Sequence, residues 1–131
     1  MAASLDDTAR RLLDGKNFAT VATLLPDGSP QTSVVWVTRD GDQALFSTVA
    51  TRRKARNLAR DPRVSVSVYD AANPYLSIEI RGRAELVVDE AKALPVELSQ
   101  KYLGQDPPNE SADEVRLVVR IVADKVITFS P

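Results

Sequence analysis

Short apolar segments separated by turn sequences dominate this chain, and they restrict it to a mainly β fold. In the clearest segment, Val64, Val66 and Val68 alternate with polar residues, as in a strand with one buried face. Short links such as the Asp-Gly pair at 40–41 are typical of β-hairpins. Strands connected in this way favour a small closed or partly closed β-barrel. The segments predicted as strands are 18–25, 31–38, 43–48, 63–69, 75–88, 115–122 and 125–129.

Three short segments have helical spacing instead. Residues 5–13 repeat apolar side chains at helical intervals, and residues 89–103 do so around Pro95, which we expect to weaken or kink the middle of that helix. A third helix is predicted to begin with Thr51 as its N-cap and to end at Asp61-Pro62. Residues 104–113 are polar and are predicted to form a surface loop. We also expect the long strand 75–88 to bend at Gly82.

Length and composition limit the classes of protein that are possible. A chain of 131 residues predicts one domain, 1–131, and no apolar run approaches the roughly 20 residues that span a bilayer. The first residues also lack the basic and apolar regions of a signal peptide, so we expect a cytoplasmic protein without a membrane partner. The sequence contains no Cys and no His, which excludes thiolate and imidazole catalysis and makes a metal site unexpected.

No catalytic residue can be assigned from the sequence. A Ser–Lys or carboxylate mechanism remains open in principle, but no GxSxG, SxxK or paired-carboxylate signature is present. If the protein is an enzyme, a bound cofactor is expected to supply the difficult chemistry.

The third predicted helix concentrates positive charge. It carries five cations between Arg52 and Arg60, whereas the whole chain has 17 basic and 18 acidic residues and a formal charge of −1. A helix N-terminus surrounded by cations is a favourable phosphate site, and the hydroxyls of Ser47 and Thr48 lie just upstream. The alternative is a solvated basic face. The near-zero net charge argues against a nucleic-acid partner.

The order and spacing of several motifs resemble a known family. These motifs are Pro-Asp-Gly-Ser-Pro-Gln at 26–31, Val34-Val35-Trp36-Val37, Phe46-Ser47-Thr48, Arg52-Arg53-Lys54-Ala55-Arg56-Asn57-Leu58, Asp61-Pro62-Arg63-Val64, Asn73-Pro74-Tyr75 and Ile78-Glu79-Ile80-Arg81-Gly82. Over residues 5–130 the chain resembles the pyridoxamine 5′-phosphate oxidase-like superfamily, and within it the proteins that use the deazaflavin coenzyme F420. The resemblance implies a split β-barrel of the FMN-binding type and a homodimer with cofactor sites at the subunit interface.

The resemblance also implies which residues bind the cofactor. In this sequence they are Thr32, Ser33, Val34, Val35, Ser47, Thr48, Thr51, Arg52, Arg53, Lys54, Asn57 and Ser77. The first four would follow the ring, and the two hydroxyl residues after them would reach the ribityl chain and phosphate. The next five would surround the phosphate, and the last would reach the cofactor from the second subunit. Whether Trp36 contacts the ring or packs in the core is left open.

The implied function is an F420-dependent reductase that transfers a hydride to a small organic molecule. Flavin-using oxidases of the family typically carry Gln where this chain has Ser77, and they have a further C-terminal segment beyond the position of Pro131. Both differences argue against an oxidase of that kind, and the number of cations favours the long anionic tail of the deazaflavin. Arg52, Arg56 or Lys101 of a second subunit would be free for the carboxylates of its tail. The alternatives are an FMN-binding oxidoreductase and a non-catalytic F420-binding protein.

Overall fold

The computed structural model describes residues 2–131, which form one antiparallel sheet and three short helices. The mainly β fold with short helices predicted from the sequence is confirmed. None of the helices formed by residues 2–131 is both long and apolar enough to cross a bilayer. The helices are α1 (Asp7–Asp14), α2 (Arg53–Arg60) and α3 (Ala93–Leu103). The strands are β1 (Ala19–Leu24), β2 (Pro30–Val35), β3 (Thr38–Asp40), β4 (Gln43–Val49), β5 (Arg63–Asp70), β6 (Asn73–Val88) and β7 (Arg116–Phe129).

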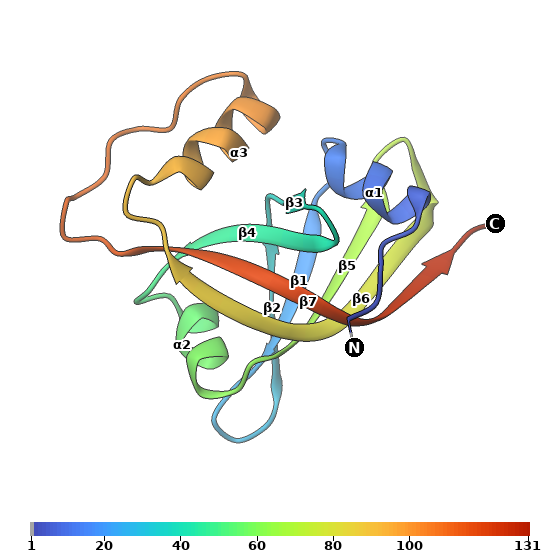
Figure 1. Cartoon of the computed structure of the whole chain (residues 1–131), viewed down its shortest axis with the longest axis horizontal. Helices are drawn as coiled ribbons and strands as arrows, with labels where there is room; N and C mark the ends of the chain where they lie inside the picture. The colour runs from blue at the N-terminus through green and yellow to red at the C-terminus, as the bar shows by residue number, and fades with distance from the viewer. Residues whose placement is uncertain (1) are drawn as a thin grey trace.

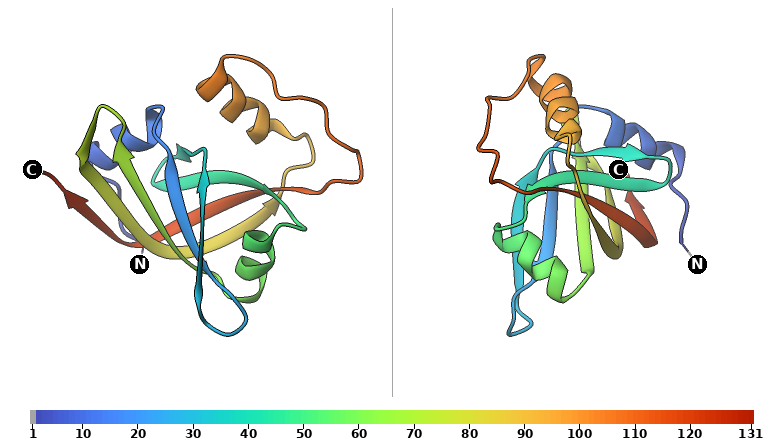
Figure 2. Two further views of the ribbon diagram at one scale, coloured as in Figure 1. Left: turned by 180° about the vertical axis from the view of Figure 1, so that it is seen from behind. Right: turned by 60° about the vertical axis from the view of Figure 1, so that its left-hand side comes forward.

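The sheet curls back on itself. Its strand order is β2-β1-β5-β6-β7-β4-β3, so β2 and β3 form its two edges. Only Trp36 and Val37 separate these two edge strands in the chain, which forces the edges close together. β6 and β7 cross the molecule as long curved strands (Figure 1), and the strands wrap around a common interior (Figure 2). The short strand β3 covers only the first residues of β4. The barrel is therefore left open between β2 and the rest of β4.

The core fills the interior of this curled sheet. Val64, Val66 and Val68 of β5 are buried as their alternation predicts, and Ile78 and Ile80 of β6 face the same interior. Helix α1 packs against β3, β5 and β6, while α2 packs against β1, β4 and β6. Each helix adds leucine or alanine side chains to the core cluster, so the two short helices cover openings that the strands leave.

The last two predicted strands are in fact one strand, β7. Residues Ala123-Asp124, predicted as a link, form a bulge at which the pairing register with β6 shifts. Asp124 is the extra residue, since Gly82 pairs with Ala123 while Arg81 pairs with Lys125. This register shift falls between Arg81 and Gly82, the position at which strand 75–88 was predicted to bend. The prediction of two strands failed because a single polar residue such as Asp124 interrupts the apolar alternation in the same way in a bulge as in a turn.

Helix α3 begins four residues later than predicted. Both carboxylate oxygens of Asp89 accept hydrogen bonds at the helix start, from the backbone N–H groups of Ala93 and Leu94 (both 3.0 Å). Lys92 precedes the helix in the left-handed conformation, with φ of 52°. Pro95 consequently lies in the first turn, where its missing N–H leaves no hydrogen bond unmade. The expected weakening or kink in the middle of the helix is therefore wrong.

A second, smaller apolar cluster lies outside the barrel, between α3 and β4. Leu94 and Leu98 of α3 pack there against Leu45. Trp36 and Tyr102 border this cluster, and their rings stack with centroids 5.3 Å apart and an interplanar angle of 7°. Helix α3 is thereby fixed above the open side of the barrel (Figure 1).

Candidate functional site

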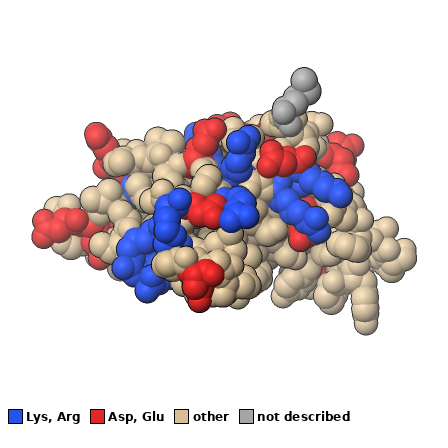
Figure 3. Space-filling model, turned by 90° about the horizontal axis from the view of Figure 1, so that it is seen from below, with Lys and Arg blue, Asp and Glu red and all other residues tan. Residues whose placement is uncertain are grey.

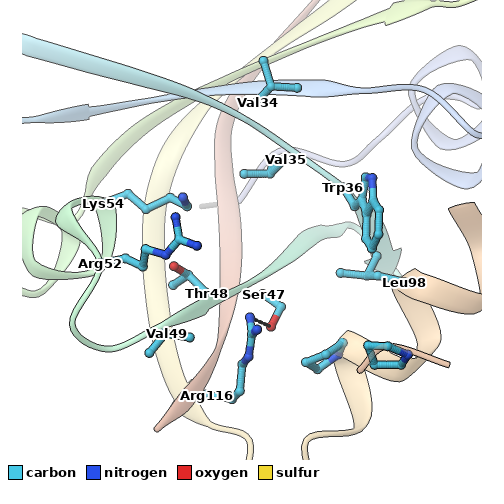
Figure 4. A pocket seen from close by; sticks show the side chains of 12 residues that line it. Val34, Val35, Trp36, Ser47, Thr48, Val49, Arg52, Lys54, Leu98 and Arg116 are labelled. Atoms are coloured by element: carbon cyan, nitrogen blue, oxygen red, sulfur yellow. Dashed lines mark hydrogen bonds between the residues drawn. The ribbon is translucent and has the colours of Figure 1, made fainter. Parts of the chain in front are cut away.

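A pocket of about 280 Å³ lies where the barrel fails to close. β2 and β4 form its facing walls, the start of α2 closes one end, and α3 with the loop after it covers another (Figure 4). The side chains around it come from segments far apart in the sequence. The lining residues are Val34, Val35, Trp36, Ser47, Thr48, Val49, Arg52, Lys54, Pro95, Leu98, Pro107 and Arg116.

β2 supplies the apolar wall. Its side chains alternate in exposure, with Thr32 and Val34 outward and Ser33 and Val35 half-buried. Val34 is 67% exposed, which is unusual for a large aliphatic side chain. The edge of β2 that faces away from β1 has no partner strand among residues 2–131, so its backbone N–H and C=O groups can bind a ligand. Trp36 both packs in the outer cluster and lines the pocket, so the two roles left open for it are compatible.

Buried hydroxyl groups at the site have no hydrogen-bond partner. Thr48 is 3% exposed and lines the pocket, yet its Oγ1 makes no hydrogen bond to any residue in 2–131. Ser33 Oγ, on β2, is also buried without a partner among these residues, although Ser33 does not line the pocket. An unpaired buried hydroxyl costs about 1–3 kcal/mol unless a ligand or water satisfies it. Both residues belong to the set predicted to bind a cofactor, and the unpaired Thr48 hydroxyl in the pocket indicates a polar ligand there.

The start of α2 brings two cations to the pocket. Arg52, not Thr51, is the N-cap residue, and it makes no side-chain cap, so the first backbone N–H groups of the helix remain available. Thr51 is displaced from the cap because a turn, closed by Arg52 N–H and Val49 O at 2.9 Å, precedes the helix. Arg52 and Lys54 line the pocket. Burial, and then the neighbouring Arg52 charge, lower the pKa of Lys54. An anion bound beside the protonated amine would stabilise its charge and offset this effect.

On the face seen in Figure 3, this positive charge does not extend into one broad patch. Arg63 pairs with Asp61 (2.8 Å) and Arg81 with Glu79 (3.0 Å). On the face shown in Figure 3, blue and red side chains lie next to one another. The cations at the pocket therefore act locally.

Sequence comparison identifies the family to which these features belong. Residues 5–130, nearly the whole chain, match the sequence profile of pyridoxamine 5′-phosphate oxidase. The chain belongs to the pyridoxamine 5′-phosphate oxidase family. An F420 reductase is 32% identical, with a TM-score of 0.83 over 94% of this chain and 98% of that chain.

Two further solved structures show the range of the family. A conserved hypothetical protein from Mycobacterium tuberculosis is 26% identical, with a TM-score of 0.77 over 98% of this chain and 86% of its own. A pyridoxamine 5′-phosphate oxidase-related, FMN binding protein from Nostoc punctiforme is 15% identical, with a TM-score of 0.65 over 91% and 76%. At that identity the likeness concerns the fold alone. The predicted split β-barrel class is confirmed.

In this family member, six of the twelve predicted cofactor residues meet at the pocket: Val34, Val35, Ser47, Thr48, Arg52 and Lys54. Thr32, Thr51 and Arg53 are exposed next to it without lining it. Ser77 pairs with Tyr69 and Phe129, at the end of β6 remote from the pocket, so this chain does not bring it to the other residues. Its contact with the cofactor of a second subunit stays a prediction.

Asn57 does not have the role predicted for it. Its side chain is fully buried, and its Nδ2 donates to Thr23 Oγ1 at 3.0 Å. Its Oδ1 accepts from Arg60 Nη2 at 3.2 Å, and Arg60 also donates to the carbonyl of Leu24. The residue therefore attaches α2 to β1 instead of contacting a cofactor. The sequence placed it near the phosphate because it lies one turn after the cations.

Replacing Asn57 with Ala should lower the free energy of unfolding by about 1–2 kcal/mol, because the buried hydrogen bonds of its amide to Thr23 and Arg60 would be lost. Urea denaturation followed by circular dichroism measures this loss. The exposed Ala59→Ser on the same helix is the control and should change stability very little. A stable Asn57→Ala protein with weakened ligand binding would instead restore the predicted binding role.

Lys101 is also not free, contrary to its predicted availability for a cofactor tail. Its Nζ donates to the carbonyl oxygens of Leu13 and Val37, both at 2.6 Å. Burial lowers the pKa of this amine to about 8. The side chain thus connects the end of α1 with the turn between β2 and β3.

Arg116 is the charged residue of the pocket that the sequence analysis missed. It opens β7, where it pairs with Val49 of β4, and it lies more than fifty positions after the basic helix. Four apolar side chains were missed as well: Val49 of β4, and Pro95, Leu98 and Pro107 from α3 and its loop. The one available signal was a lone arginine at the start of a strand otherwise rich in valine.

Proposed function

We propose that this protein is an F420-dependent reductase, which transfers a hydride from reduced coenzyme F420 to a small organic acceptor. The pocket in the split of the barrel carries the proposal. It combines Arg52 and Lys54, the unpaired Thr48 hydroxyl, and an apolar wall at Val34 and Val35. A phosphorylated ring system requires these same three elements. The 32% identity to an F420 reductase over nearly the whole of both chains supports the choice of coenzyme.

The residues present fit such a cofactor. Lys54, Arg52 and the free N–H groups of α2 would hold its phosphate, and Thr48 Oγ1 would regain a hydrogen bond. The free edge of β2 near Val35 would orient the polar side of the ring, and the apolar side chains around Trp36 would exclude water. The coenzyme, when bound, supplies the hydride, which suits a chain without Cys or His.

We further propose a homodimer in which each cofactor site lies at the subunit interface. The outer face of β5 and β6 carries Ser65, Ser67 and Ser77 beside Tyr69 and the Arg81–Glu79 ion pair, and none of the three helices packs on this outer surface. The small serine side chains let a second sheet approach closely, and the two charges already neutralise each other. The pocket of about 280 Å³ is at the lower limit for a drug-sized ligand, so a second subunit would complete it.

Sedimentation velocity at micromolar concentration should give twice the 14.3 kDa mass of the chain. Ser67→Arg should shift the equilibrium toward monomer, because a charged side chain would have to be buried between the two sheets. Ser4→Arg, at an exposed position near the N-terminus, is the matched control and should stay dimeric. A wild-type protein that sediments as a stable monomer would refute the shared site.

The choice of coenzyme is tested by titration. Coenzyme F420 should quench Trp36 fluorescence at lower concentration than FMN, and a longer glutamate tail should tighten binding further. Arg56, which is exposed on the same helix, remains for the added carboxylates, with a gain of about a few tenths to 1 kcal/mol that falls with salt. Tighter binding of FMN would support the alternative of an FMN-binding oxidoreductase. F420 binding without oxidation of the reduced coenzyme by any acceptor in a panel would indicate a non-catalytic binding protein.

A further inference from the structure

The loop that follows α3 has two side chains that turn inward, and both lie at the pocket or against a residue that lines it. Within residues 104–115, every side chain is exposed except Pro107 and Glu110, which are half-buried. Pro107 lines the pocket, and Glu110 contacts Arg116, which lines it as well. The half-buried side chains of this loop thus lie at the wall of the pocket opposite α2.

Glu110 holds one edge of the Arg116 guanidinium. Arg116 Nε lies 3.0 Å from Glu110 Oε1 and 3.2 Å from Oε2. Arg116 Nη1 lies 3.4 Å from Ser47 Oγ, and Nη2 has no acceptor among residues 2–131. The Nη end, which binds carboxylate or phosphate in bidentate fashion, therefore points toward Ser47 inside the pocket (Figure 4).

The charges around the Arg116 guanidinium leave it able to attract an anion. Lys92 Nζ lies 3.5 Å from the same Glu110 carboxylate and donates to the carbonyl oxygen of Ser111 at 3.1 Å. Two cations thus share one carboxylate, and the cluster keeps a net positive charge. The Arg116 hydrogen bond lowers the pKa of Glu110, so the carboxylate stays ionised and keeps the guanidinium oriented at neutral pH.

Arg116 and the α2 cations occupy different sides of the pocket. Ser47 and Arg116 lie on the outer face of β4 and β7, on which α3 packs, whereas Thr48 points to the inner side. Arg52 and Lys54 approach from α2, beyond Thr48 (Figure 4). One phosphate group held at the helix start would leave the Nη end of Arg116 for another anionic group.

We propose that Arg116, positioned by Glu110, binds a second anionic group of the ligand, separate from the phosphate at Arg52 and Lys54. The site then selects ligands that carry both a phosphate and a carboxylate. This inference rests on the proposed function and narrows it, because FMN has one phosphate whereas the F420 tail has a phosphate and carboxylates.

Arg116→Gln tests the inference by fluorescence titration of Trp36 in the full-length protein. It should raise the dissociation constant of coenzyme F420 about tenfold and that of FMN less than about twofold. Arg120→Gln is the matched control, since Arg120 lies on the same face of β7, pairs with Asp40 at 3.0 Å and does not line the pocket. It should leave both constants unchanged. Arg116→Lys should recover part of the lost affinity.

Glu110→Gln tests the positioning role. Alone it should raise the F420 dissociation constant about threefold, and combined with Arg116→Gln it should add nothing, because Glu110 acts through Arg116. Additive effects in the double variant would show that Glu110 acts through the fold of the loop, and would overturn its positioning role.

The outcomes separate this inference from the proposed function. If neither the wild-type protein nor the Arg116→Gln variant binds F420, the proposed function and the second anion site are both refuted. If wild-type protein binds F420, Lys54→Ala weakens binding and Arg116→Gln does not, the function stands and the second anion site is refuted. Equal weakening of F420 and FMN by Arg116→Gln would also refute it, since Arg116 would then be one more phosphate ligand. If FMN binds too weakly to titrate, the dissociation constant of F420 alone decides: a rise in Arg116→Gln supports the inference, and an unchanged value refutes it.

Discussion

Gly82→Ala should lower the free energy of unfolding by about 3 kcal/mol or more, the largest stability effect expected of a single added methyl group in this protein. A Cβ at this position would lie 2.0 Å from the carbonyl oxygen of Val122 and 3.1 Å from the Cα of Ala123. Both atoms belong to the backbone of β7, at the bulge where the register with β6 shifts. Backbone atoms cannot rotate away, so the two central strands of the barrel would have to separate.

Gly28→Ala provides the comparison for this measurement. Gly28 has φ of 86°, and no atom lies within 4 Å of a Cβ built there, so the cost is conformational only, at about 1–2 kcal/mol. Urea denaturation of both variants, followed by circular dichroism, gives the two losses directly. A Gly82→Ala protein no less stable than Gly28→Ala would mean that β6 and β7 do not approach as closely as the bulge requires.

Lys54→Ala should raise the dissociation constant of coenzyme F420 by about 5- to 150-fold, corresponding to roughly 1–3 kcal/mol for a charge-assisted hydrogen bond. Lys54 is the half-buried cation at the α2 end of the pocket, and its lowered pKa reflects the cost of burying its charge. Removing the side chain takes away that cost, so the free energy of unfolding should stay constant or rise slightly.

Arg56→Ala is the matched control for Lys54→Ala. Arg56 lies on the same helix, is exposed and does not line the pocket, so the affinity for the coenzyme should fall far less. Arg53→Ala should also have a small effect, because Arg53 is exposed beside the pocket. Isothermal titration gives the affinities, and thermal melts give the stabilities. A large loss of stability in Lys54→Ala with unchanged affinity would show that the cation is structural.

The strands of the barrel could be predicted from the sequence because their pattern is local. Alternation such as Val64, Val66 and Val68 reflects one buried face, and each strand carries that information in its own residues. The basic helix and the hydroxyl pair before it are local features in the same sense, which is why Ser47, Thr48, Arg52 and Lys54 were predicted and are found at one pocket. The order of the motifs was sufficient to indicate the family.

What only the tertiary structure decided depends on which segments meet. Asn57 has the sequence position of a phosphate neighbour, but the packing of α2 on β1 places its side chain against Thr23. Arg116 reaches the pocket only because β7 pairs with β4, a contact between residues more than sixty positions apart. Burial and hydrogen bonding are set by such long-range contacts, and no residue carries a local signal of its distant partner.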